Sequence, residues 1–136
     1  MKRFLSKPGA LAADAHGNVI ITDLYNGRIC RRDADGRPLP EWSLTADLLF
    51  ADVAVSRPSG LALDGAGNIF MAGGGPHVQQ FDGAGRPLLR WRADWQGQLM
   101  LEHPSGVAVD SHGDVYVADA QANRVSKFRI LTATDR

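Results

Sequence analysis

Short apolar runs separated by glycine-containing turns recur along this chain. Three of them, at residues 19–22, 69–72 and 115–118, consist mainly of β-branched, aromatic and other apolar residues. Runs this short, bounded by turn residues, are typical of strands buried on both faces rather than of helices. The pattern therefore predicts an all-β chain built from short strands.

Each run lies inside a longer phrase that occurs three times. The phrase starts at Pro8, Pro58 and Pro104 and reads PGALAADAHGNV, PSGLALDGAGNI and PSGVAVDSHGDV. In every copy a first strand is predicted, at residues 10–13, 60–63 and 106–109. It leads to an aspartate and then to a glycine, the residue that hairpin turns with positive φ favour. The copies start roughly 50 residues apart, a period typical of propeller blades.

The three copies differ at their ends. A third, more polar strand is predicted in every copy, at residues 28–32, 77–81 and 124–128. In the first two copies a second glycine turn opens a fourth strand that runs through Trp42 or Trp91. In the third copy Phe128 leads directly into Arg129, without such a turn. The last blade is therefore expected to lack its own outer strand.

The full phrase, PxGLAxDxxGNhhhAD followed by NxRhxxF and DxxGxxL, resembles the NHL repeat over residues 8–130. The resemblance implies a β-propeller of blades with four antiparallel strands, usually about six in a ring. It divides a single domain at residues 1–136 into blade 1 (about 8–44), blade 2 (about 58–92) and blade 3 (about 104–131). Gluconolactonase-like and virginiamycin-lyase-like propellers share the blade but not this full signature.

Three blades cannot close a ring, because propellers use about 4 to 8 of them. A second copy of the chain can supply the missing half, with blade 1 of each copy packed against blade 3 of the other. We therefore expect a homodimeric six-bladed propeller. Residues 1–5 are a candidate fourth strand for blade 3 of the neighbouring copy, where they would cap an exposed strand edge.

Composition narrows the function classes. The 15 basic and 15 acidic residues balance, so no net charge draws the chain to nucleic acid or to an anionic membrane. Cys30 is the single cysteine, which precludes an intrachain disulfide, and no apolar run is long enough to span a bilayer. A cytoplasmic location is the expectation. The alternative is that the chain is a fragment of a longer protein that carries its own targeting segment.

Two Asp–Arg pairs occupy equivalent hairpins: Asp23 with Arg28, and Asp119 with Arg124. We interpret both as structural pairs that fix the hairpin by a charge-assisted hydrogen bond. The middle copy has neither the aspartate nor the arginine at these positions. The aspartates before the first turn, Asp14, Asp64 and Asp110, recur in every copy and are expected to accept hydrogen bonds from turn amides.

Histidines are the candidate ligand-binding residues. His16 and His112 share one position in the repeat, and His77 lies where the middle copy departs from the pattern. The resemblance extends to peptidylglycine amidating lyase, whose zinc histidines follow the proline of the first strand phrase. Here those positions are Gly9, Ser59 and Ser105. No catalytic residue, metal ligand or cofactor is therefore predicted.

The sequence thus predicts a non-enzymatic scaffold that binds proteins or small ligands and associates with itself. One alternative is a lyase or lactonase-like hydrolase with a metal on the pore axis. Another is an RNA-binding NHL domain that uses the arginines between residues 28 and 37 and between 86 and 92. A pore lined by serine, alanine and backbone favours the scaffold, whereas histidines or carboxylates converging on the axis favour the enzyme.

Overall fold

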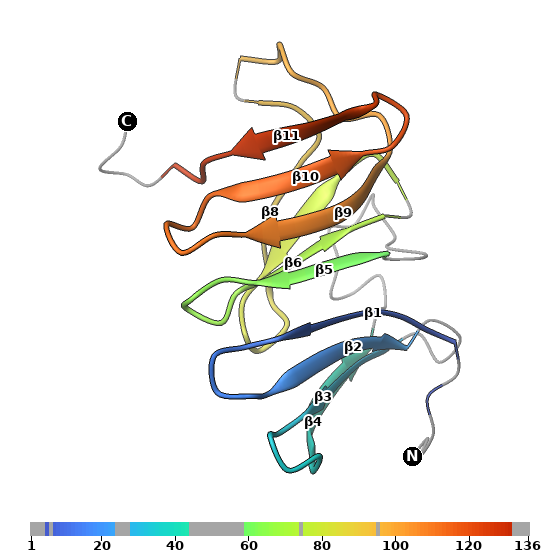
Figure 1. Ribbon diagram of the computed structural model, residues 1–136, viewed down its shortest axis with the longest axis vertical. Helices are drawn as coiled ribbons and strands as arrows, with labels where there is room; N and C mark the ends of the chain where they lie inside the picture. The colour runs from blue at the N-terminus through green and yellow to red at the C-terminus, as the bar shows by residue number, and fades with distance from the viewer. Residues whose placement is uncertain are drawn as a thin grey trace.

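The computed structural model describes residues 5, 7–23, 28–43, 59–73, 75–94 and 96–131, with the backbone alone for Trp42 and Ser43. Within these residues the chain forms eleven β-strands in three antiparallel sheets (Figure 1). Each sheet is a meander in which strands adjacent in the sequence are paired. The all-β prediction and the repeating blade are confirmed.

The first two sheets have four strands each, and the third has three among the described residues. We refer to the sheets as blades 1, 2 and 3. Blade 1 consists of β1 (Pro8–Ala13), β2 (Val19–Asp23), β3 (Arg28–Arg32) and β4 (Pro38–Ser43). Blade 2 consists of β5 (Gly60–Leu63), β6 (Ile69–Ala72), β7 (Val78–Phe81) and β8 (Pro87–Trp91). Blade 3 consists of β9 (Pro104–Val109), β10 (Val115–Asp119) and β11 (Arg124–Phe128).

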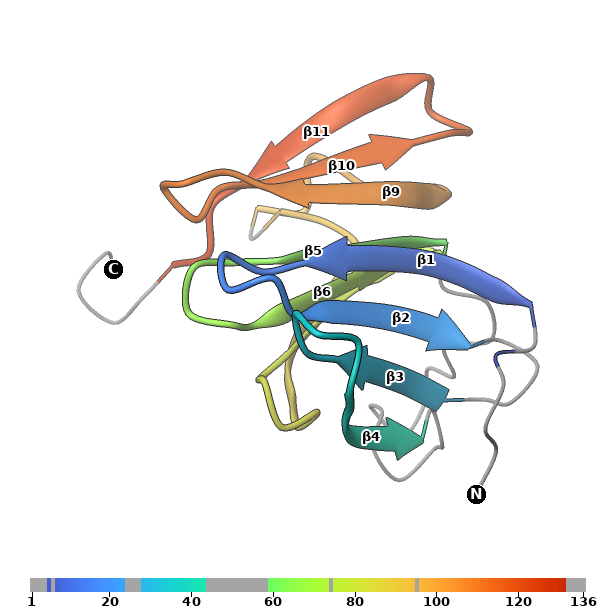
Figure 2. The same ribbon diagram turned by 60° about the horizontal axis from the view of Figure 1, so that its bottom comes forward.

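The blades stack through their first strands. β1 contacts β5, and β5 contacts β9, while the later strands of each blade fan outward (Figures 1 and 2). One apolar cluster joins blades 1 and 2 and includes Ile20, Ile29, Ile69 and Phe81. A second cluster joins blades 2 and 3. Each blade is therefore stabilised by burying a sheet face against its neighbour.

Gly60 marks the closest approach between two first strands. A Cβ atom at this position would lie 2.9 Å from Gly106 Cα and 2.9 Å from Ser105 O. Ser59 Oγ donates a hydrogen bond to the same Ser105 carbonyl at 2.8 Å, so β5 and β9 are held together at this end. Glycine at position 60 is thus needed for the close packing of blades 2 and 3, whereas blade 1 has Ala10 at the equivalent position.

Replacing Gly60 by alanine is expected to lower the free energy of unfolding by about 1–3 kcal/mol, because the backbone of β9 cannot yield as a flexible side chain can. Gly65→Ala is the matched control, since nothing lies within 4 Å of a Cβ there. Urea unfolding followed by fluorescence measures both variants. Equal stability of the two would contradict the close packing of the first strands.

Some predicted features lie outside the described residues. They include the side chain of Trp42 and residues 1–4 of the proposed N-terminal strand. The described residues contain no helix with the length and apolar character needed to cross a membrane.

Candidate functional site

The two outer blades each leave one sheet face uncovered by described residues. On blade 3 this face carries Tyr116, whose neighbours across the sheet are Ala108 and Lys127. It also carries Val125 of β11, the outermost described strand of blade 3, and this side chain is 69% exposed. We call the residues Ala108, Tyr116, Ala118 and Val125 the blade 3 free face.

On blade 1 the uncovered face is the one that points away from blade 2. Leu11 pairs with Ile21, and Ala13 pairs with Val19, so these four side chains share it. Leu11 is 69% exposed. We call these four residues the blade 1 free face. Large exposed apolar surfaces on a soluble protein usually mark an interface.

The free faces repeat the pattern of the faces that are already packed. Blade 2 presents to blade 3 the set Ala62, Phe70, Ala72 and Val78, whose repeat equivalents are the blade 3 free face. Blade 2 presents to blade 1 the set Leu61, Leu63, Ile69 and Met71, whose equivalents are the blade 1 free face. These residues thus give each free face a patch with the apolar character of a blade junction. On the blade 3 free face, Lys127 lies beside this patch, where blade 2 has Gln80.

A buried charge cluster lies at one end of blade 1. Arg28 Nε donates to Asp23 Oδ2 at 2.8 Å, and Arg28 Nη1 donates to Glu41 Oε2 at 2.9 Å. The Arg28 and Asp23 side chains are 7% and 0% exposed. The hydrogen bond that Arg28 donates to Asp23 is the main reason why the pKa of Arg28 rises, and burial raises the pKa of the nearby Cys30 thiol. Paired in this way, these groups serve structure rather than acid–base chemistry.

The equivalent pair in blade 3 has a different geometry. Arg124 Nη2 is 3.7 Å from Asp119 Oδ2 and donates its hydrogen bond to the Met100 carbonyl instead. The Asp119 carboxylate accepts the backbone N–H groups of Glu102 at 2.9 Å and His103 at 2.8 Å. Burial alone raises the pKa of Asp119, but these hydrogen bonds and the charge of Arg124 bring it below its ordinary 3.8. Asp119 therefore fastens the segment that enters β9.

The carboxylates of the turn aspartates accept hydrogen bonds from backbone N–H groups of their own turns. Asp14 Oδ1 accepts the N–H groups of His16 and Asn18, and Asp64 and Asp110 accept the equivalent pairs. The side-chain hydrogen bond from Asn18 is the main reason why the pKa of Asp14 is lowered. Among the described residues, no group of three or more His, Cys, Asp or Glu is placed to hold a metal ion.

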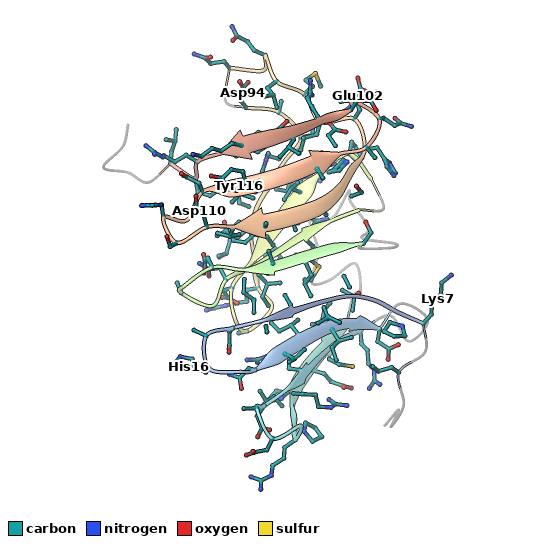
Figure 3. All side chains as sticks on the ribbon, in the orientation of Figure 1. Lys7, His16, Asp94, Glu102, Asp110 and Tyr116 are labelled. Carbon is teal, nitrogen blue, oxygen red and sulfur yellow. The ribbon has the colours of Figure 1, made fainter. Side chains whose placement is uncertain are left out.

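The candidate histidines are not brought together. His16 and His112 are exposed residues on the first turns of blades 1 and 3, with the corresponding turn of blade 2 between them. Figure 3 shows His16 and Asp110, which is close to His112 in the sequence, on separate turns. His77 directly precedes β7, at the other end of the blade 2 strands. The three side chains therefore do not form one site in a single chain.

A cavity of about 430 Å³ opens between blades 2 and 3, near their outer strands. Leu89 and Trp91 of β8 line one side, and Phe128, Ile130 and Leu131 line the other. Lys127, Arg129 and Asp94 add charge at its border. The sequence does not show this cavity directly, because it depends on how two blades are placed relative to one another. The related sequence signal is the lack of a second glycine turn after Phe128, and no described strand pairs with the outer side of β11.

Residues 101–128, which contain the strands of blade 3, match the family model of the NHL repeat. One similar solved structure is virginiamycin B lyase from Staphylococcus aureus, with 15% identity and a TM-score of 0.60, and the match covers 94% of this chain and 43% of that one. Another is a chain of a nidogen/laminin complex, with 21% identity and a TM-score of 0.64, and the match covers 94% of this chain and 46% of that one. A third is a gluconolactonase from Xanthomonas campestris, with 17% identity and a TM-score of 0.59, and the match covers 85% of this chain and 35% of that one. No curated protein matches the chain.

These likenesses show the fold. The chain spans less than half of the length of each of these three structures. They include both enzymes and a protein complex, so the blade by itself is compatible with either class of function.

Proposed function

We propose that this NHL-repeat β-propeller chain, a single domain over residues 1–136, is a non-enzymatic scaffold whose ring is completed by a second copy. The observation that carries the proposal is the repetition of the blade-junction pattern on both free faces. In the completed ring, the blade 3 free face of each copy packs against the blade 1 free face of the other. The twofold axis then produces two identical junctions.

The two free faces are complementary in the same way as the packed ones. At both internal junctions a face with small first-strand residues meets a face with larger aliphatic residues. On the blade 3 free face, the small residues Ala108 and Ala118 lie next to Tyr116. The blade 1 free face carries the larger residues Leu11, Val19 and Ile21. Two positions differ: Arg32 stands where blades 2 and 3 have Phe81 and Phe128, and Lys127 stands where blade 2 has Gln80. Both lie on the third strand of their blade, so the first and second strands keep the centre of the junction apolar.

A scaffold rather than an enzyme is supported by the first strands, which line the axis side of the stacked blades. The strands β1, β5 and β9 consist of proline, glycine, alanine, leucine, valine and one serine. None of these can serve as a metal ligand or acid–base group except Ser105, whose Oγ is 3.4 Å from its acceptor, the Ala118 carbonyl. Proteins or small ligands would be bound by the loops at the strand ends. His16, His112 and His77 stay candidates for such contacts.

Light scattering at micromolar concentration tests the proposal. We expect a folded species with twice the 14.7 kDa mass of the chain. Metal analysis of the same sample separates the alternatives, because a tightly bound stoichiometric metal with turnover of a lactone would favour the lactonase-like hydrolase. A well-folded monomer, or an open series of larger assemblies, would overturn ring closure by two copies.

A further inference from the structure

The outermost strand of blade 3 has an unused edge. In Figure 2, β11 is the last strand of its sheet, and no described strand pairs with its outer side. Blades 1 and 2 each have a fourth strand at this place, β4 and β8. An edge of this kind presents unpaired N–H and C=O groups to any extended segment that can reach it.

The intact blades show what a fourth strand contributes. Trp91 of β8 pairs with Val78 of β7, and Trp42 of β4 pairs with Ile29 of β3. Val78 and Ile29 are 0% exposed. Val125 is the equivalent residue of β11, and it is 69% exposed. Val78 and Ile29 are also covered by the next blade, whereas Val125 lies on the blade 3 free face. Among the described residues, no aromatic residue stands opposite Val125 as Trp91 and Trp42 stand opposite Val78 and Ile29.

Trp91 shows how such an aromatic residue acts. Its ring lies 6.4 Å from the ring of Phe70 and 5.6 Å from that of Phe128, both in edge-to-face geometry. Contacts of this kind contribute about 0.5–1.5 kcal/mol beyond the buried area. The fourth strand therefore covers the third strand of its own blade and also contacts the next blade.

The other side of the same edge leads to the cavity. Successive residues of a strand point to opposite faces of the sheet. A strand that places one residue over Val125 therefore turns its neighbours toward blade 2, where Leu89, Phe128 and Leu131 border the 430 Å³ cavity. Leu89 and Leu131 are each 38% exposed. One added strand would bury apolar surface on both faces of β11.

The described residues do not supply this strand. Residues 129–131 follow β11 directly and line the cavity instead of turning back along the edge. The fourth strands of blades 1 and 2 are joined to the next first strand by residues 44–59 and 92–103. A strand made by residues 1–5 would have only residues 6–7 for the same connection to β1. This short reach argues against the N-terminal strand that the sequence suggested.

The charged side chains along β11 indicate which kind of segment would bind at its edge. Arg124, Lys127 and Arg129 have side chains that are 40%, 55% and 73% exposed. Asp114 contacts two of them, at 3.3 Å from Lys127 and 3.4 Å from Arg129. Arg124 also lies 3.7 Å from Asp119, so three cations face two carboxylates and the edge keeps one positive charge in excess. A carboxylate beside the aromatic residue would complement it.

We propose that β11 is an acceptor edge for another polypeptide, which adds as the antiparallel fourth strand of blade 3. The segment is extended, places an aromatic residue opposite Val125, carries an acidic residue beside it and directs apolar side chains into the cavity. This site does not depend on ring closure, because a single chain presents the edge and the cavity.

A fluorescein-labelled peptide with the sequence of residues 36–43, GRPLPEWS, is a suitable probe, since it contains an acidic residue beside a tryptophan. Fluorescence anisotropy with the full chain is expected to show saturable binding. The same peptide with Trp42→Ala should bind at least about tenfold more weakly. Leu89→Lys in the protein should weaken binding by a similar factor, because it places a charge at the cavity.

Leu88→Lys is the matched control, as Leu88 is an exposed neighbour on the opposite face of β8. It should bind the probe as the original chain does. Leu11→Lys, on the far side of the molecule, should also bind it, so that failure of ring closure is told apart from failure of strand addition. No saturable binding, equal binding of the Trp42→Ala peptide, or equal loss in Leu88→Lys would overturn the proposal.

Discussion

Leu11→Lys is expected to convert the proposed dimer to a monomer. Leu11 lies at the centre of the blade 1 free face, paired with Ile21, and its 69% exposure leaves room for a lysine in the single chain. In the completed ring, the same lysine would be buried without a partner against the blade 3 free face. Such a charge costs about 3–5 kcal/mol, which weakens self-association by at least about 100-fold. Light scattering over a dilution series measures the shift in mass.

The control for this variant is Leu88→Lys, another exposed apolar residue, 50% exposed, outside both free faces. It should keep the mass of the original chain. The Leu11→Lys monomer should also unfold at a lower temperature, because two apolar faces lose their cover. If Leu11→Lys keeps the dimer while Leu88→Lys disrupts it, the interface lies elsewhere and the proposed ring is wrong.

Much of the fold could be predicted from the sequence, because the repeat displays short-range rules three times. Asp14, Gly17 and Asn18 encode a turn through hydrogen bonds within four residues of one another. The flanking apolar runs then form strands with bounds close to those expected. β7 begins at Val78 instead of residue 77, while β1 and β9 start earlier, at the prolines. The three strands that the described residues form in blade 3 agree with the absence of a second glycine turn after Phe128.

Contacts between distant segments could not be predicted in the same way. The spacing of Asp119 and Arg124 matches that of Asp23 and Arg28, yet Asp119 mainly holds the segment at Glu102 and His103. Glu41 joins the Arg28 cluster from the other side of an irregular β3–β4 pairing. These outcomes depend on how each connection crosses the end of a blade. Hydrophobic periodicity does not carry that information.

Asp119→Asn is expected to lower the free energy of unfolding by about 3 kcal/mol at neutral pH. The buried carboxylate accepts two backbone N–H groups at 2.9 and 2.8 Å, and hydrogen bonds to charged groups contribute about 1.5–3 kcal/mol each. The neutral amide of asparagine can keep only part of this hydrogen-bond energy. Its NH₂ group would lie against the backbone N–H donors that the carboxylate now accepts. The segment that carries the fully buried Leu101 into the junction of blades 2 and 3 would loosen.

The pH dependence distinguishes this role from simple packing. Because the folded pKa of Asp119 is below 3.8, its contribution is fully present above the unfolded pKa and is lost as the pH falls through the folded one. The stability difference between the original chain and Asp119→Asn should therefore be constant from about pH 6 to 8 and shrink below about pH 4. Urea unfolding at several pH values measures it, with the exposed Asp35→Asn as a charge-matched control. A difference that does not change down to pH 3 would show that the carboxylate charge does not fasten this segment.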